Sequence, residues 1–260
     1  MSYAASIVIP LLRQADEWLE KCVRSALLQS VPTEVVVVRS EKTPQSNLET
    51  LERLRHQHTR LSVICERKAG SFPNAINTGF QCAQADRVGL LLSDDWLDEG
   101  AVACCIGEPA DIVSTGNAVY FPDGRINEAA CKNISMARFR SLKTLEAKAN
   151  YLEHFFLFRK EIVLRVGLDE SIGNYPGIDD YDLIWTLLEH DASVAIVEKR
   201  LYHYRDHDGE RLSLADPAER VKNLRKILRK HNVGERDAEE IVKRHAKWYG
   251  KPIYKVMNLG

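Results

Sequence analysis

The 260-residue sequence predicts an α/β protein, a three-layer sandwich around a mostly parallel central sheet. Over the first hundred residues, short apolar runs rich in β-branched residues alternate with stretches of helical period, which is the pattern of βαβ units. Two of these runs, 34–39 and 87–92, are almost continuously apolar, as expected of strands that are covered on both faces. A hydrophobic share of 45% is enough for one substantial core.

Four strands and the helices between them make up the first half of the predicted fold. The strands are Ser6–Pro10, Glu34–Arg39, Leu61–Cys65 and Arg87–Leu92. Ligands of such sheets bind beyond the carboxyl ends of the strands. That rule directs attention to the segments that follow the four strands, which are 10–13, 39–42, 66–74 and 93–96.

From about residue 110 the regular alternation stops, and a mixed α/β continuation is predicted. A strand over 111–120 leads into the turn signal Pro122-Asp-Gly-Arg125 and a hairpin partner. Further elements are a strand over 154–158, helices over 160–166 and 180–189, and a strand over 194–197. The second half is therefore expected to extend the sheet in a less regular way.

The last segment, 214–260, is expected to be a basic amphipathic helical extension. Between residues 218 and 251 we count eleven Lys or Arg against five Asp or Glu, with Val221, Leu224 and Ile227 at helical spacing. Two helices packed on the core are the simpler interpretation. Contact with a membrane surface or a partner, and a homodimer, stay open.

Composition narrows the classes of function and the compartment. A formal net charge of -1 and a pI near 6.7 argue against a nucleic-acid partner. Six cysteines are scattered without C-x-x-C pairs, which favours a reducing cytoplasm. The first residues do not resemble a signal peptide, and no window reaches the length of a membrane span. We expect a cytoplasmic protein, with contact at the inner face of the membrane left open.

The strongest local signal is Leu90-Leu-Leu-Ser-Asp-Asp-Trp96, a strand that ends in two adjacent carboxylates. Such a pair is costly to hold together without a cation, and a hard divalent ion such as Mn²⁺ or Mg²⁺ could bridge it to a diphosphate. The alternative is that these aspartates only cap the helix that begins near Asp98. Neither G-x-x-x-x-G-K-[ST] nor G-x-G-x-x-G follows a strand, which disfavours P-loop and dinucleotide enzymes.

From residue 5 to about residue 213, the order of the segments resembles glycosyltransferase family 2. The matching segments are Ser6–Pro10, Trp18–Gln29, Val35–Ser40, Ala69–Gly79, Ser93-Asp-Asp95, Asp179-Asp-Tyr-Asp-Leu183 and Tyr202-His-Tyr-Arg-Asp-His207. Each segment alone is weak, whereas their common order and separations are specific. The resemblance implies a GT-A fold, a Rossmann-like sandwich over 1–213 with a nucleotide-binding half (1–110) and an acceptor-binding half (111–213).

The resemblance also implies an activity and a set of site residues. The activity is metal-dependent, inverting transfer of a sugar from a UDP-, dTDP- or GDP-sugar to a glycan or lipid-linked acceptor, as in bacterial surface polysaccharide synthesis. Asp180 would be the catalytic base, and Tyr175 and Asp179 would contact the acceptor. The metal ligands would be Asp94, Asp95 and His207. The nucleotide would contact Pro10, Leu11, Arg39, Lys68 and Asp94.

Two alternatives remain at the level of the sequence. A sugar-nucleotidyltransferase shares the α/β plan and an acidic metal site, although the Gly-rich basic loop it needs after the first strand is replaced by Leu11-Leu-Arg13. A catalytically degenerate binding module is suggested by Arg39 and Leu92, which stand where the family pattern has aspartates. Fold-level resemblance does not decide among these functions.

Overall fold

The computed structural model describes residues 2–66, 71–172, 179–209, 216–253 and 255. Its elements follow in the order β1 (Ala5–Leu11), α1 (Asp16–Leu27), β2 (Thr33–Arg39), α2 (Gln45–Gln57), β3 (Leu61–Cys65), α3 (Phe72–Cys82), β4 (Arg87–Leu90), β5 (Trp96–Leu97), α4 (Ala101–Ile106), β6 (Ile112–Tyr120), α5 (Met136–Ser141), α6 (Leu145–Tyr151), β7 (Phe156–Arg159), α7 (Lys160–Val166), the 3₁₀ turn η1 (Glu170–Ile172), α8 (Asp179–Glu189), β8 (Val194–Arg205), α9 (Pro217–Lys230) and α10 (Glu235–Ala246).

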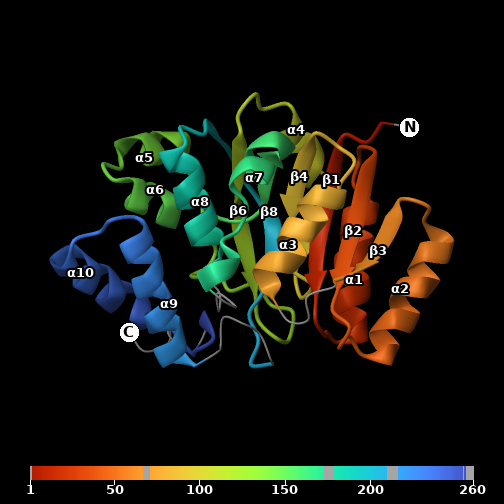
Figure 1. Cartoon of the computed structure of the whole chain (residues 1–260). Helices are drawn as coiled ribbons and strands as arrows, with labels where there is room; N and C mark the ends of the chain where they lie inside the picture. The colour runs from red at the N-terminus through yellow and green to blue at the C-terminus, as the bar shows by residue number, and fades with distance from the viewer. Residues whose placement is uncertain (1, 67–70, 173–178, 210–215, 254, 256–260) are drawn as a thin grey trace.

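These strands form an eight-stranded sheet in the order β3-β2-β1-β4-β7-β6-β8-β5 (Figure 1). The four N-terminal strands β3, β2, β1 and β4 are parallel, as the βαβ pattern predicts. Strand β7 runs antiparallel between β4 and β6, β8 is parallel to β6, and β5 is antiparallel to β8. The sheet is therefore parallel in its first half and mixed in its second.

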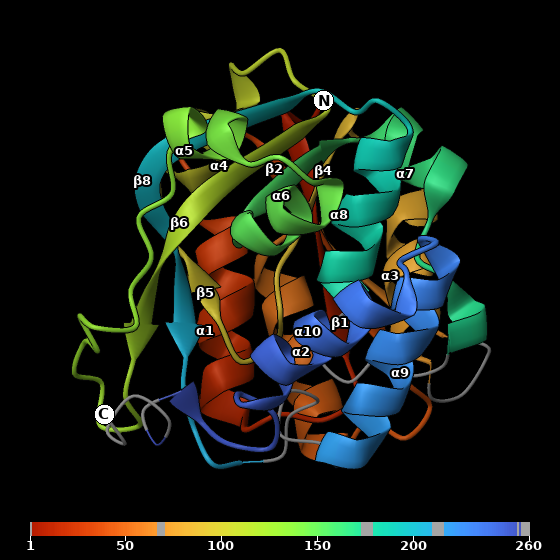
Figure 2. The ribbon, with the colours of Figure 1, turned by 90° about the vertical axis from the view of Figure 1, so that its left-hand side faces the viewer.

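Helices cover both faces of this sheet, and the two faces alternate along each strand. Val8 of β1 belongs to the core shared with α3, α7 and α8, whereas Ile7 and Ile9 belong to the core shared with α1, α2 and α4. Figure 1 looks onto the first of these faces, and Figure 2 shows α1 on the other side of the sheet. The two apolar faces explain why the strands read as continuous hydrophobic runs.

Helix α3 packs very closely on the sheet, because Gly79 faces it. A Cβ at Gly79 would lie 2.2 Å from Cγ1 of Val8, so any side chain here would push the helix away. The helix starts at the N-cap Ser71, whose side chain accepts a hydrogen bond from Asn74 N, and it has Pro73 in its first turn. The Asn-x-Gly helix seen in the sequence is thus fixed by packing.

Several strands begin or end at other residues than predicted, because pairing with neighbouring strands sets where a strand begins and ends. Strand β8 extends to Arg205, well beyond the predicted 194–197, because it pairs with both β6 and β5. After β6, the expected hairpin partner is reduced in the described residues to two isolated bridges, Tyr120 with Ile126 and Asn117 with Lys132. The predicted strand over 154–158 starts only at Phe156 and ends at Arg159.

The C-terminal extension forms two helices, as the simpler interpretation holds, and α9 is part of the main core. Leu224, Ile227 and Leu228 are buried in the same apolar cluster as the residues of α8. Figures 1 and 2 both show α9 beneath α8, with α10 beside α9. Within the described ranges, no helix has both the length and the apolar character needed to cross a bilayer.

Candidate active site

The acidic pair lies in the turn between β4 and β5. Leu91 N donates to Val8 O, which prolongs the contact of β4 with β1, and Asp95 N donates to Leu92 O at 3.1 Å, which closes the turn. Strand β5 then pairs antiparallel with β8, with Trp96 opposite His203. This pairing brings the end of β8 against the two aspartates, although more than one hundred residues separate them in the sequence.

The Asp95 carboxylate is enclosed by donors from β8. The side chain is only 1% exposed, the Tyr202 hydroxyl donates to Oδ2 at 2.5 Å, and Arg205 N donates to Oδ1 at 2.7 Å. Burial raises the pKa of Tyr202, and the charge of Asp95 raises it further, so the phenol stays protonated. Both oxygens of Asp95 are therefore held by protein groups.

Asp94 instead faces His207, which follows β8. His207 Nε2 lies 3.2 Å from Asp94 Oδ2, and Gly209 N donates to His207 Nδ1 at 3.0 Å. The ring is nearly buried and meets the Trp18 ring edge-on at 4.7 Å. Arg205 Nε donates to the carbonyl oxygen of Asp94 at 2.9 Å, which fixes the turn. The contact with Asp94 places an imidazole beside a carboxylate at the carboxyl edge of the sheet.

The set of metal ligands predicted from the sequence, Asp94, Asp95 and His207, stays a prediction. Among the described residues, no three His, Cys, Asp or Glu side chains come together as a metal site. Asp95 accepts one hydrogen bond at each oxygen, and each carboxylate oxygen has a second lone pair. Asp94 and His207 suit a divalent ion that takes its remaining oxygen ligands from substrate phosphates and water, which is how Mg²⁺ is commonly bound.

Asp180, at the start of α8, forms a second polar pair with His154. His154 Nε2 lies 3.1 Å from Asp180 Oδ2, and Tyr181 N donates to Asp180 Oδ1 at 2.9 Å. Burial raises the pKa of Asp180, but the hydrogen bond from His154, together with hydrogen bonds from backbone N–H groups, brings the net pKa below its usual value. Asp180 is thus an ionised carboxylate at neutral pH.

The two polar pairs are joined by packed side chains. The His154 ring lies 5.1 Å from the Tyr202 ring, and the Tyr202 hydroxyl holds Asp95, next in sequence to Asp94. A carboxylate suited to general-base chemistry and a carboxylate–imidazole pair suited to a cation therefore belong to one connected site. The residues that build it come from the turn between β4 and β5, the segment before β7, the end of β8 with the residues after it, and α8, so no single sequence segment contains it.

A second acidic group lies beneath Asp180. Glu153 forms an ion pair with Lys132 and accepts a hydrogen bond from Asn117 Nδ2 at 3.0 Å. Burial raises the pKa of Glu153, Lys132 lowers it, and the nearby charge of Asp180 raises it again. The net effect is a raised pKa of Glu153, with burial as the largest cause.

Three of the residues predicted to bind the nucleotide, Pro10, Leu11 and Arg39, lie at the carboxyl ends of β1 and β2. Leu11 is opposite Arg39 in the parallel register, next to Pro10, and Ser40 N donates to Leu11 O at 2.9 Å. Lys68 and Tyr175 lie outside the described residues, and so does the side chain of Asp179, which begins α8. The roles assigned to all of these residues stay predictions.

Sequence reasoning missed three residues that build the site: His154, Tyr202 and Arg205. Tyr202 and Arg205 belong to the Tyr202–His207 segment that matches a family motif, so this motif was a signal that could have identified them. His154 precedes a short apolar run and carries no local signal. Its role depends on α8, whose Asp180 lies 26 residues further along the chain.

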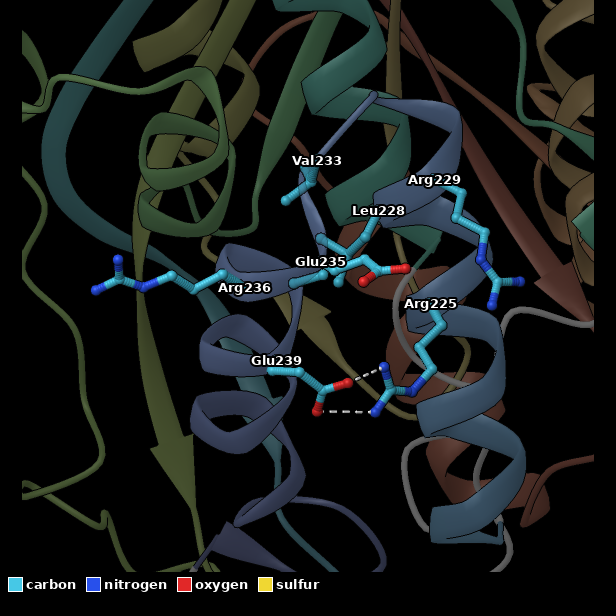
Figure 3. Close-up of a pocket in the computed structure, with 8 residues that line it drawn as sticks. Arg225, Leu228, Arg229, Val233, Glu235, Arg236 and Glu239 are labelled. Atoms are coloured by element: carbon cyan, nitrogen blue, oxygen red, sulfur yellow. Dashed lines mark hydrogen bonds and ion pairs between the residues drawn. The ribbon is translucent and has the colours of Figure 1, made fainter.

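A pocket of about 550 Å³ lies between α9 and α10, away from these side chains. Figure 3 shows that Arg225 is paired with Glu239 there, whereas Arg229 and Arg236 point away from each other. The cations do not converge on one point, so the pocket lacks the arrangement of an anion site. A smaller pocket of about 340 Å³ lies beside Arg39, between α2 and the sheet edge.

Comparison with known proteins identifies a glycosyltransferase with the GT-A fold. Residues 6–167 match the model of glycosyl transferase family 2, and the chain belongs to this family. Among solved structures, it is similar to TarS from S. aureus in complex with UDP-GlcNAc, with a TM-score of 0.66 and 16% identity over 95% of this chain and 72% of that one. The mannosyltransferase PcManGT from Pyrobaculum calidifontis, in complex with GDP-Man and Mn²⁺, gives the same four values. The predicted GT-A fold is confirmed.

Relatives with curated names are bacterial glycosyltransferases. The chain is 28% identical over 190 residues to the chondroitin synthase and to the hyaluronan synthase of Pasteurella multocida, with 71% of this chain covered. The uncharacterized glycosyltransferase EpsJ of Bacillus subtilis is 22% identical over 214 residues, which covers 78% of this chain and 61% of EpsJ. The chain matches only 19% and 18% of the lengths of the two synthases, so it corresponds to one part of each.

Proposed function

We propose that this chain is a metal-dependent, inverting glycosyltransferase that moves a sugar from a UDP-, dTDP- or GDP-sugar to a glycan or lipid-linked acceptor. The observation that carries the proposal is the link between the Asp94–His207 pair and the Asp180–His154 pair through Tyr202. Membership of family 2 and likeness to bacterial synthases support a role in polysaccharide assembly.

In this proposal, Asp94, Asp95 and His207 would hold Mn²⁺ or Mg²⁺. The bound ion would offset the charge of the departing nucleoside diphosphate. Because Gly209 N donates to His207 Nδ1, Nδ1 carries no proton, and the proton of the neutral ring is on Nε2. Coordination through Nε2 would move that proton to Nδ1 and break the Gly209 contact, so metal binding is coupled to the position of the chain after His207.

Asp180 is the general base of the proposed reaction. An acceptor hydroxyl attacks the anomeric carbon while the bond from that carbon to the diphosphate oxygen breaks, and the hydroxyl proton passes to Asp180. Attack from the face opposite the leaving group inverts the configuration. An ionised carboxylate with a depressed pKa is present in its proton-accepting form over the whole neutral range.

The nucleotide of the sugar donor is proposed to contact Pro10, Leu11 and Arg39 at the carboxyl edge of the sheet. Lys68, which follows β3 in the sequence, is proposed to contact it as well. Arg39 Nη1 donates to Ser40 O at 3.3 Å, which uses one of its five N–H groups. The guanidinium can therefore donate to carbonyl oxygens of a nucleobase. A carboxylate at this position would require donors from the base instead.

A thermal-shift screen tests the proposal. UDP-, dTDP- and GDP-sugars are compared, each with Mn²⁺, with Mg²⁺ or with chelator, and a donor at about 100 times its Kd is expected to raise Tm by roughly 5–10 °C. The expected shift requires metal and is lost in Asp94→Asn and His207→Gln, while the exposed control His56→Gln keeps it. No shift with any donor, or an equal shift in the chelated protein, contradicts the proposal.

A further inference from the structure

We propose that His154 is a positioning residue for Asp180: its Nε2–H group fixes the carboxylate that receives the acceptor proton and keeps it ionised. The inference rests on the proposed function and adds to it a determinant of the pH dependence. No direct contact of His154 with Asp94 or His207 is required. Its effect is therefore expected on acceptor activation and not on donor binding.

The backbone around His154 is anchored on both sides to β6. Ser114 Oγ donates to Glu153 O at 2.6 Å and accepts from Glu153 N at 3.1 Å. On the other side, Phe155 N donates to Thr115 Oγ1 at 2.9 Å. These contacts attach the residue to a strand that is buried along nearly its whole length. The position of His154 is therefore set by the sheet and not by a mobile surface.

The ring of His154 is held between two aromatic side chains. It meets the Phe156 ring edge-on at 4.7 Å and the Tyr202 ring at 5.1 Å, and its side chain is 16% exposed. Tyr202 is itself fully buried and bonded to Asp95. Rotation of the imidazole would require both neighbours to move, so the direction of Nε2 is fixed before any substrate binds.

The hydrogen-bonding capacity of the ring shows where its proton lies. An ionised carboxylate is only an acceptor, so Nε2 carries the proton that faces Asp180 Oδ2. Nδ1 is buried and has no hydrogen-bond partner among the described residues. A proton on Nδ1 would be buried without an acceptor, which is unfavourable. The ring thus presents one polar hydrogen, directed at the proposed base.

The charges around Asp180 explain why such a donor is needed. Glu153 lies close enough for the charges of the two carboxylates to interact, while Lys132 forms an ion pair with Glu153 and Asn117 donates a hydrogen bond to it. Tyr181 N serves the other oxygen of Asp180. Without His154, burial still raises the pKa of Asp180, and hydrogen bonds from backbone N–H groups are left to oppose it. A protonated Asp180 cannot accept the acceptor proton.

The experiment compares His154→Leu, which removes the donor, with His154→Gln, which keeps an N–H donor on a side chain of similar reach. The rate of sugar transfer is measured from pH 4 to 9 at saturating donor and metal. Asp180 is active when ionised, and its activity falls as pH drops through its pKa. In His154→Leu we expect this acidic limb to move upward by about one pH unit or more, with kcat reduced about tenfold at neutral pH.

Further variants show whether an effect of His154→Leu comes from the lost N–H donor. His154→Gln is expected to restore most of kcat and of the acidic limb, and the donor KM is expected to change less than about twofold in both variants. The exposed His56→Leu, on α2, serves as the matched control. A folded His154→Leu protein with a wild-type pH profile and kcat overturns the inference.

A spectroscopic measurement covers the case in which His154→Leu does not fold. The ¹⁵N signals of the His154 ring in the wild-type protein, assigned by their loss in His154→Gln, are expected to show Nε2 protonated and Nδ1 bare. The reverse tautomer overturns the inference. Asp180→Asn distinguishes failure of the proposed function from failure of this inference. If Asp180→Asn keeps full sugar transfer, Asp180 is not the catalytic base. If Asp180→Asn loses transfer while the His154 variants behave as the wild type, only the role of His154 is rejected.

Discussion

Asp94 and Asp95 are neighbours in the sequence and have different surroundings in the structure. Asp95 is buried with donors at both oxygens, while Asp94 is turned toward His207. A buried carboxylate must be hydrogen-bonded to remain charged, and Tyr202 and Arg205 supply those bonds. One carboxylate thus anchors the turn, and the other faces the imidazole of His207.

This anchoring role predicts the effect of Tyr202→Phe. Removal of the hydroxyl takes a hydrogen-bond donor from the buried Asp95 carboxylate, and the expected loss of stability is about 1–3 kcal/mol. Urea unfolding measures the change, with Tyr3→Phe near the N-terminus as the control. Equal stability of the two variants would show that the hydroxyl does not hold Asp95.

At the scale of elements, close helix–sheet packing positions the carboxyl edge. Helix α3 lies against β1 and β2 because Gly79 leaves no side chain between them. Asn77, on the same helix, bonds the segment after α7 through Leu168 N at 2.8 Å and Leu168 O at 2.9 Å. Displacement of α3 would therefore disturb both the sheet edge and the segment that leads toward α8.

A pair of glycine substitutions tests this packing. Gly79→Ala places a methyl group 2.2 Å from Val8 Cγ1, and such overpacking is expected to cost about 1–3 kcal/mol. Gly107→Ala is the matched control, because a Cβ there meets nothing within 4 Å and its φ is −75°. Thermal or urea unfolding distinguishes them. If Gly79→Ala is as stable as Gly107→Ala, the packing argument fails.

At the scale of the whole molecule, the C-terminal helices belong to the same body as the site. His231, which follows α9, lies with Nε2 3.0 Å from Asp182 and Nδ1 2.8 Å from Glu189, and its ring stacks on Trp185 at 4.1 Å. Lys230 Nζ adds a contact of 2.8 Å to Asp182. These contacts join α9 to α8, the helix that begins beside Asp180.

His231→Phe tests this connection. The substitution keeps an aromatic ring beside Trp185 but removes the polar contacts of His231 with Asp182 and Glu189. The contact between the buried Asp182 and Lys230 is retained. The expected cost is about 3 kcal/mol, measured by urea unfolding. The exposed His190→Phe, at the end of α8, is the control. A His231→Phe protein as stable as that control would show that α9 is held by apolar contacts alone.

The sequence by itself determined the α/β class, the positions of the first four strands, the two C-terminal helices and membership of family 2. These features are local: periodicity follows from burial of a strand or helix face, and the family match follows from the order of segments. The Asp94-Asp95 turn was also visible, because an apolar strand ends abruptly in two charges.

Only the tertiary structure decided which side chains meet. The pairing of β5 with β8 placed Tyr202 on Asp95 and His207 on Asp94, and the packing of α8 placed Asp180 on His154. The length of β8 was likewise set by its partners β5 and β6. Contacts between residues 26 to 113 positions apart depend on sheet order and helix packing, which no local pattern encodes.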